Sequence, residues 1–164
     1  MARPRKIKKL SPNDPPERAA RRILRARLAE FYSHWSDPDQ TPTLEQLHDT
    51  RISGKRLRYS AESLREFYPD RLALLIELLK RGQDLLGEIQ DCATQREMVR
   101  RSLVRMRKDD REIAALERLI AEYDQRQTAL LAQFREVWRG MAMREFRRSL
   151  KAMIGRTKAS NDSA

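Results

Sequence analysis

The chain has 164 residues, of which 36% are charged and 40% are hydrophobic, and its formal net charge at pH 7 is +11. A chain of this length suits a single domain with a sizeable core, and its many Leu, Ala, Arg and Glu residues with only five glycines predict an all-α protein. The positive excess makes polyanions the natural partners, namely nucleic acid, an anionic membrane surface or inorganic phosphate chains.

Two features point to a cytoplasmic protein. The single cysteine, Cys92, excludes an internal disulfide and fits a reducing compartment. No stretch approaches the ~20 consecutive apolar residues of a membrane span, and the basic N-terminus lacks the apolar run of a signal peptide. We therefore expect a cytoplasmic location.

The N-terminal part of the chain predicts a tail and then a helix. Residues 1–12 carry five cations and are expected to form a basic, flexible tail. Asn13 or Asp14 can cap a helix that runs from about Pro16 to Trp35, with proline in its first turn. The apolar side of this helix consists of Ala20, Ile23, Leu24, Leu28, Phe31 and Trp35.

A second helix is predicted from Thr41 or Thr43, either of which can cap it, to Tyr68. Pro69 sets the limit because proline disfavours helical backbone in the residue before it. Gly54 lies inside this helix, where glycine costs roughly 1 kcal/mol, so we expect it to allow close approach of a partner helix.

Two long helices complete the predicted fold. The third runs from Asp70 to about Met106, and seven of the eight residues over 72–79 are apolar, so we expect burial on two sides, in a bundle or against a second subunit. The fourth begins at Asp109 or Asp110, with a kink or short break expected at Gly140. The prediction is an antiparallel four-helix bundle over residues 13–155, with a long hairpin of the third and fourth helices projecting near residues 107–111 and a disordered tail over 156–164.

The most informative stretch is LHDTRISGKRLRYSAE, residues 47–62. At ~100° of rotation per helical residue, one side of it is an apolar seam and the adjacent band is a cationic stripe. The stripe contains His48, Arg51, Lys55, Arg58 and Glu62. No acid occurs between residues 50 and 61, so these cations and Arg56 repel one another unless an anion relieves them. Arginine suits phosphate because its planar fork makes paired hydrogen bonds.

Other kinds of site have little support. His48 could donate to a phosphate oxygen or could be a structural histidine bonded to a neighbouring helix, and both interpretations stay open. His34 and Cys92 do not have the spacing of a metal site, so neither a metal nor another cofactor is expected. Asp84 and Asp91 share a helix face, but no nucleophile with a base and no glycine-rich phosphate loop is visible, so we expect no enzyme activity.

Residues 47–62 resemble the signature helix of the CHAD family, the conserved histidine α-helical domain. The pattern of a histidine, Arg-Val and a basic block is matched by His48, Arg51, Ile52, Lys55, Arg56, Leu57 and Arg58, with Ile for Val and Lys for the first Arg. Residues 79–91 resemble the second block of the family through Lys80, Leu86, Gly87 and Asp91. The resemblance covers roughly residues 16–100.

The resemblance implies a non-enzymatic module that binds inorganic polyphosphate. The positions carried over are His48, Arg51, Lys55, Arg56, Arg58 and Lys80. From charge alone we add Arg21, Arg22 and Arg25 of the first helix. The usual domain of the family has two copies of the four-helix unit and this chain has one, so we expect a homodimer in which two His48 stripes line one groove. Association with polyphosphate granules in the cytoplasm would follow.

Two rival functions remain open. A nucleic-acid binder would normally interleave aromatic platforms with its cations, but aromatic residues make up 6% of the chain and only Tyr59 lies in the stripe. A protein–protein scaffold would use the hydrophobic hairpin, and its charge would be incidental. An enzyme acting on polyphosphate is more distant, since no metal-binding carboxylate cluster is visible.

Overall fold

The computed structural model describes residues 4–7, 10–35, 37, 40–68, 72–105, 110–142 and 144–155. These residues form five α-helices and one short 3₁₀ helix, and none of them is in a strand, so the all-α prediction is confirmed. The elements are α1 (Pro16–His34), α2 (Leu44–Ser63), η1 (Arg65–Phe67), α3 (Ala73–Arg105), α4 (Asp110–Ala142) and α5 (Arg144–Gly155).

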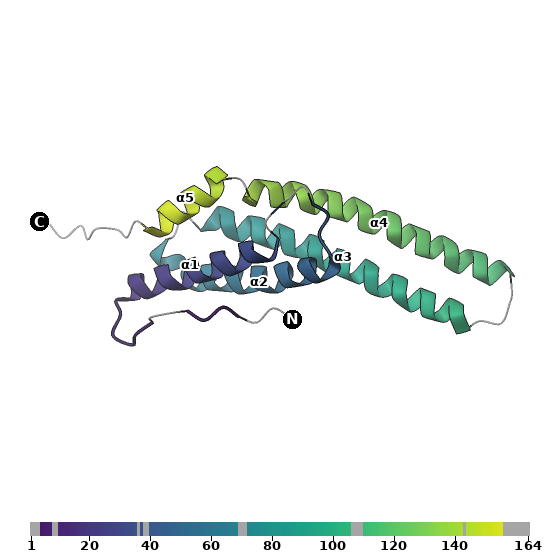
Figure 1. Cartoon of the computed structure of the whole chain (residues 1–164), viewed down its shortest axis with the longest axis horizontal. Coiled ribbons are helices and arrows are strands. Elements are labelled where there is room, and N and C mark those ends of the chain that lie inside the picture. Colours follow the sequence, from purple (N-terminus) through teal and green to yellow (C-terminus); the bar gives the residue numbers. More distant parts are fainter. Residues whose placement is uncertain are drawn as a thin grey trace, which may run out of the picture.

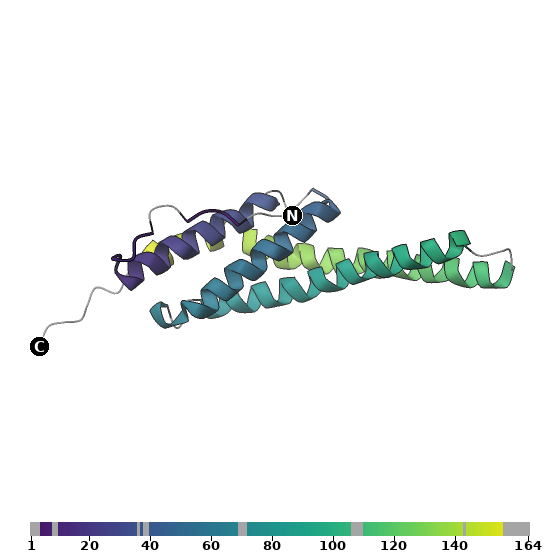
Figure 2. The same ribbon diagram turned by 90° about the horizontal axis from the view of Figure 1, so that it is seen from below.

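Helices α3 and α4 form the predicted long hairpin, and each has 33 residues (Figure 1). Helices α1 and α2 cover only one half of it, so the other half projects as an arm (Figures 1 and 2). In the arm, which we define as residues 93–126, no described residue is buried, whereas Cys92 and Gln127 at its base are. Of the predicted tip at residues 107–111, residues 107–109 lie outside the described residues, and so does the tail over 156–164.

Helix α2 begins with a capping box. The Thr43 side chain accepts a hydrogen bond from the Gln46 N–H, and the Gln46 side chain accepts one from the Thr43 N–H. The helix ends at Ser63, earlier than the predicted limit at Tyr68, and the chain continues through η1. Tyr68 follows η1 and is buried in the core, with 3% of it exposed.

Helix α1 packs on its neighbours through a cluster of aromatic rings. Phe31 lies 5.0 Å from Trp138 between ring centroids, and Trp35 stacks on Trp138 at the same distance. A Cβ atom added at Gly54 of α2 would lie 3.2 Å from the Phe31 ring, so the predicted close approach at this glycine is confirmed. The cluster therefore joins α1 to both α2 and α4.

Helix α4 ends at Ala142 and α5 begins at Arg144, so the helix break expected at Gly140 falls two residues later. Tyr32 of α1 donates a hydrogen bond of 2.7 Å to the carbonyl of Met141, one of the last carbonyls of α4 and so without a partner in its own helix. Helix α5 then packs back over α1 and α4, and Leu150 and Ile154 are buried. The predicted fourth helix is thus two helices, α4 and α5, and α5 packs against α1.

The apolar opening of α3 is buried within the bundle. Leu72, Leu75, Ile76 and Leu79 are buried, whereas Leu74 is 57% exposed. Packing inside one chain therefore accounts for the burial of most of this stretch.

The N-terminal segment contacts α1. Arg5, in the predicted flexible tail, donates its backbone N–H to the Glu30 carboxylate. The predicted domain limits, residues 13–155, stay a prediction.

We expect Gly54→Leu to lower the free energy of unfolding by about 2 kcal/mol, because the new side chain collides with Phe31 in a packed interface. Gly87→Leu is the matched control, since a Cβ there meets nothing within 4 Å. It should raise stability by up to about 1 kcal/mol through helix propensity. Urea unfolding of both variants measures the difference, and equal effects would contradict the packing of Gly54.

Candidate functional site

Part of the cationic stripe of α2 lines an open groove between α2 and α3. The volume of the groove is about 450 Å³. The wall on α2 consists of Arg51, Lys55, Arg58 and Tyr59, and the wall on α3 consists of Gln83, Asp84, Gly87, Glu88 and Asp91. Three of the nine predicted site residues are therefore brought together, on successive turns of one helix.

Two of these cations have no ion pair with a described residue. Arg51 and Lys55 are half-buried, and no described carboxylate oxygen lies within 4.0 Å of either. The Nε atom of Arg51 is buried without a hydrogen-bond partner among the described residues. A half-buried guanidinium with an unused hydrogen-bond donor can bind an anion.

Arg58 is held by neighbours on its own helix. Its Nη1 lies 3.3 Å from an Oε1 of Glu62, and its guanidinium lies 4.6 Å from the centre of the Tyr59 ring. Glu62 also pairs with Lys80 of α3 at 3.9 Å. Arg58 and Lys80 thus share one carboxylate and keep an excess of positive charge.

The wall on α3 is acidic, and its position opposite the stripe was not predicted from the sequence. Asp84, Glu88 and Asp91 lie on successive turns, and Glu88 pairs with Arg126 of α4 at 3.0 Å. Asp84 and Asp91 form no ion pair with a described residue. Their shared face was visible in the sequence, but nothing in the helical period shows which helix that face meets.

Arg56 points away from the groove and forms a buried ion cluster with α1. Its Nη1 lies 2.5 Å from Glu30, and Arg27 contacts the other carboxylate oxygen at 2.7 Å. Only 3% of Glu30 is exposed. Burial raises the pKa of the Glu30 carboxyl, but the hydrogen bonds from Arg27 and Arg56 lower it by more, so the net pKa lies below the ordinary 4.5.

The other predicted residues lie around the groove or away from it. His48 is half-buried, one turn before Arg51, and does not line the groove. Arg22 pairs with Asp14 at 2.6 Å. Arg21 is half-buried on α1, and Arg25 lines a different cleft, between α1 and α5.

Neither a metal-binding cluster nor a membrane-spanning helix is found in the described part of the chain. No group of three or more His, Cys, Asp or Glu side chains there is arranged to hold a metal ion. None of the described helices is long and apolar enough to cross a membrane.

The site is thus a basic helix face in a small all-α protein, and comparison with known proteins identifies its class. The family description "CHAD domain" matches residues 2–100, more than half of the chain. The chain therefore belongs to the CHAD family, and its match contains a single copy of the signature helix. No curated protein and no solved structure matches it.

The buried Glu30 carboxylate makes the stability of the protein depend on pH in a defined direction. Because the folded pKa of Glu30 lies below 4.5, its stabilisation is complete above that pH and is lost as the pH falls through the folded pKa. We expect Glu30→Gln to lower the free energy of unfolding by about 2 kcal/mol at pH 7. The difference in the free energy of unfolding between this variant and the parent protein should become smaller at acid pH.

The matched control is Glu117→Gln, on the exposed face of the arm, which should change stability little at either pH. Urea unfolding at pH 7 and at acid pH measures both variants. If Glu30→Gln lowers the free energy of unfolding equally at the two pH values, Glu30 is not an ionised member of the cluster.

Proposed function

We propose that this protein is a non-enzymatic module that binds inorganic polyphosphate along the α2 wall of the groove. The observation that carries the proposal is the state of Arg51 and Lys55, which face the groove without an ion pair to a described residue. Membership of the CHAD family supports it further. A cytoplasmic location, with association to polyphosphate granules, belongs to the same proposal.

Binding would occur by electrostatic capture. Arg51, Lys55 and Arg58 lie at helical steps of four and three, so they form a row along which consecutive phosphates of a chain can lie. Arginine contributes paired hydrogen bonds and lysine a compact charge. Each neutralised phosphate releases counterions, so affinity should fall steeply with salt.

Only part of the predicted site takes part directly in this proposal. Arg56 serves the structure, because its ion pair with Glu30 fixes α2 against α1 and so orients the row. Lys80 extends the positive field at one end of the row and His48 at the other. Arg21, Arg22 and Arg25 lie on α1 and add to the long-range field.

A homodimer is the second part of the proposal. Two copies related by a two-fold axis, the commonest symmetry of soluble oligomers, would place their two α2 stripes on either side of one groove. The apolar opening of α3 gives the homodimer no support, because the bundle buries most of it. In the homodimer we propose, two His48 stripes line one groove that accepts the phosphate chain.

Nucleic acid remains the main rival ligand, and the burial of the aromatic residues argues against it. Of the ten aromatic side chains, only Tyr59 is exposed. Single-strand binding through stacked bases needs several exposed rings. In the proposed function, nucleic acid competes only through its backbone charge.

We expect Arg51→Ala with Lys55→Ala to weaken polyphosphate binding by about tenfold or more, because two unpaired charges of the row are lost. The slope of log Kd against the logarithm of the salt concentration should also fall by about one to two. Arg100→Ala with Arg118→Ala is the matched control, since it removes two exposed charges from the arm. Fluorescence anisotropy with labelled polyphosphate at two salt concentrations measures both.

Competition separates polyphosphate from nucleic acid in the same assay. Long-chain polyphosphate should displace bound DNA at equal phosphate concentration, and DNA should fail to displace polyphosphate. If Arg51→Ala with Lys55→Ala loses no more polyphosphate affinity than the control Arg100→Ala with Arg118→Ala, the row is not the binding site.

Removing the acidic wall tests which partner the groove takes. We expect Asp84→Asn with Asp91→Asn to strengthen polyphosphate binding by about threefold or more, because two repulsive charges facing the chain are lost. Light scattering of the same variant reports the dimer. A weaker dimer with unchanged polyphosphate affinity would show that the groove pairs two copies and does not bind the chain.

A further inference from the structure

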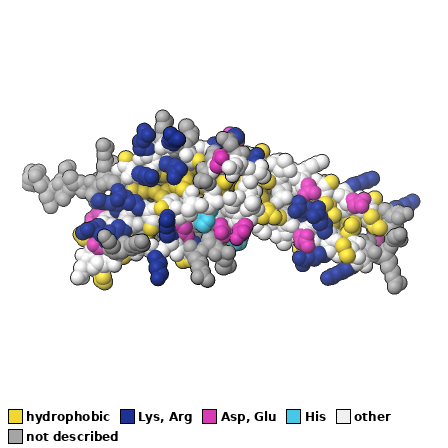
Figure 3. Space-filling model, in the orientation of Figure 1, with side chains coloured by type: hydrophobic (Ala, Val, Ile, Leu, Met, Phe, Trp, Pro, Cys, Tyr) yellow, Lys and Arg dark blue, Asp and Glu magenta, His cyan; other side chains and the backbone are white. Residues whose placement is uncertain are grey.

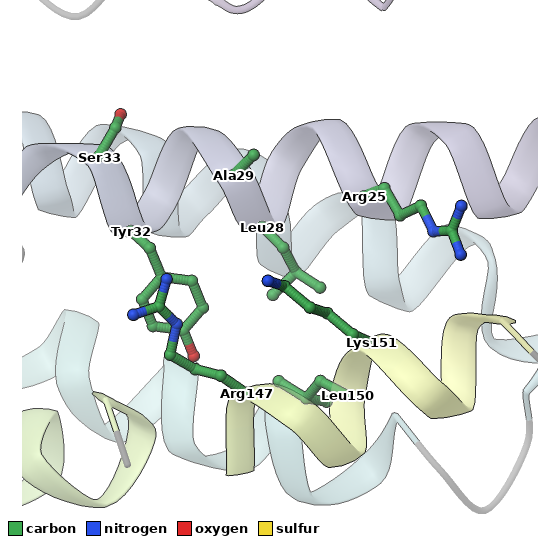
Figure 4. Close-up of a pocket in the computed structure, with 8 residues that line it drawn as sticks. All are labelled: Arg25, Leu28, Ala29, Tyr32, Ser33, Arg147, Leu150 and Lys151. Carbon is green, nitrogen blue, oxygen red and sulfur yellow. The ribbon is translucent and has the colours of Figure 1, made fainter. Parts of the chain in front are cut away.

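A second cleft lies between α1 and α5, and the polyphosphate proposal does not use it. Its volume is about 470 Å³, which falls in the range of small-molecule sites, roughly 300–1,000 Å³. The lining residues are Arg25, Leu28, Ala29, Tyr32, Ser33, Arg147, Leu150 and Lys151 (Figure 4). The cleft is therefore built by the first and last helices of the chain.

The floor of the cleft is apolar. Leu28 of α1 and Leu150 of α5 point toward each other (Figure 4), and Ala29 also lines the cleft. The polar atoms of the floor are already used, because the Tyr32 hydroxyl donates to the Met141 carbonyl and the Ser33 hydroxyl donates to the Glu30 carbonyl. The floor thus offers an apolar surface and leaves few polar groups for a ligand.

The rim of the cleft is cationic. Arg25, Arg147 and Lys151 line it, no acid does, and none of the three forms an ion pair with a described residue. The Arg147 guanidinium lies 4.4 Å from the centre of the Tyr32 ring, which holds it over the floor. In the space-filling view, a hydrophobic strip over α1 and α5 lies between groups of Lys and Arg side chains (Figure 3).

We propose that this cleft binds a small anionic amphiphile, a molecule with one phosphate or carboxylate head and a compact apolar body. The three rim cations select the charged head, and the floor of Leu28 and Leu150 selects the body. Polyphosphate fits poorly, because it is charged along its whole length and would cover the apolar floor with hydrated groups. A neutral apolar molecule would leave all three cations uncompensated.

The alternative use of α5 is insertion of an amphipathic helix into a membrane surface. Such a helix must present its apolar face to the bilayer. Ile154 is fully buried in the protein, so α5 cannot present its whole apolar face to a bilayer. The free small molecule is therefore the occupant we propose, and vesicle binding is an outcome that the test can detect.

Decyl phosphate is the probe, used with the full chain and below the concentration at which it forms micelles. Isothermal titration calorimetry should give affinities about tenfold or more above those for decanol and for inorganic phosphate, which each lack one half of the recognised chemistry. Decanoate should bind as well, which separates a general anionic head from a phosphate-specific one. Sedimentation with phosphatidylglycerol vesicles should leave the protein in solution.

Exposed residues of the cleft provide variants that fold. Arg25→Gln with Lys151→Gln should weaken decyl phosphate binding about tenfold, and Ala29→Phe should weaken it as strongly by filling the floor. The charge-matched control on the same two helices is Arg18→Gln with Arg148→Gln, which should bind like the parent protein. Urea unfolding confirms that each variant is folded.

Polyphosphate affinity measured on the same variants keeps this inference separate from the function proposed for the groove. Equal affinity for decanol and decyl phosphate would overturn the inference, as would unchanged binding in the cleft variants. Vesicle binding without binding of monomeric decyl phosphate would also overturn it.

Discussion

Phe31 occupies the point where three helices meet, and the arrangement of both clefts depends on it. On one side, its ring leaves room for α2 only because residue 54 has no side chain. On another side, it packs against Trp138 of α4. The neighbouring Tyr32 bonds to the end of α4, where the chain turns into α5. One turn of α1 thus sets the position of α2, which carries the cationic row, and of α5, which closes the second cleft.

The charges of α2 divide into two groups with different physical roles. Arg56 is paired with a buried carboxylate, and removing either partner would leave a charge with little access to water. Arg51 and Lys55 are separated from the acids of α3 by more than ion-pair distance, so their repulsion remains in the free protein. The first group holds the helix in place, and the second leaves a local field that a ligand can relieve.

The sequence predicts the helices well and the partners of their faces poorly. The capping box at Thr43 and the close approach at Gly54 follow from local rules, since each depends on residues within one turn or on a missing side chain. The end of α4 depends on Tyr32, which is 109 residues away, and no helical period reports such a contact. For the same reason, the acidic wall of the groove and the cleft between α1 and α5 could not be predicted.

The arm over residues 93–126 affects the order in which parts of the protein unfold. Its two helical segments contain no described residue that is buried, and Arg96 pairs with Asp124 across them. Segments with little buried apolar surface open at a lower free energy than the core. The arm can therefore separate and re-form while the bundle that carries both clefts stays intact, so its amide hydrogens should exchange through local opening and those of the bundle through global unfolding.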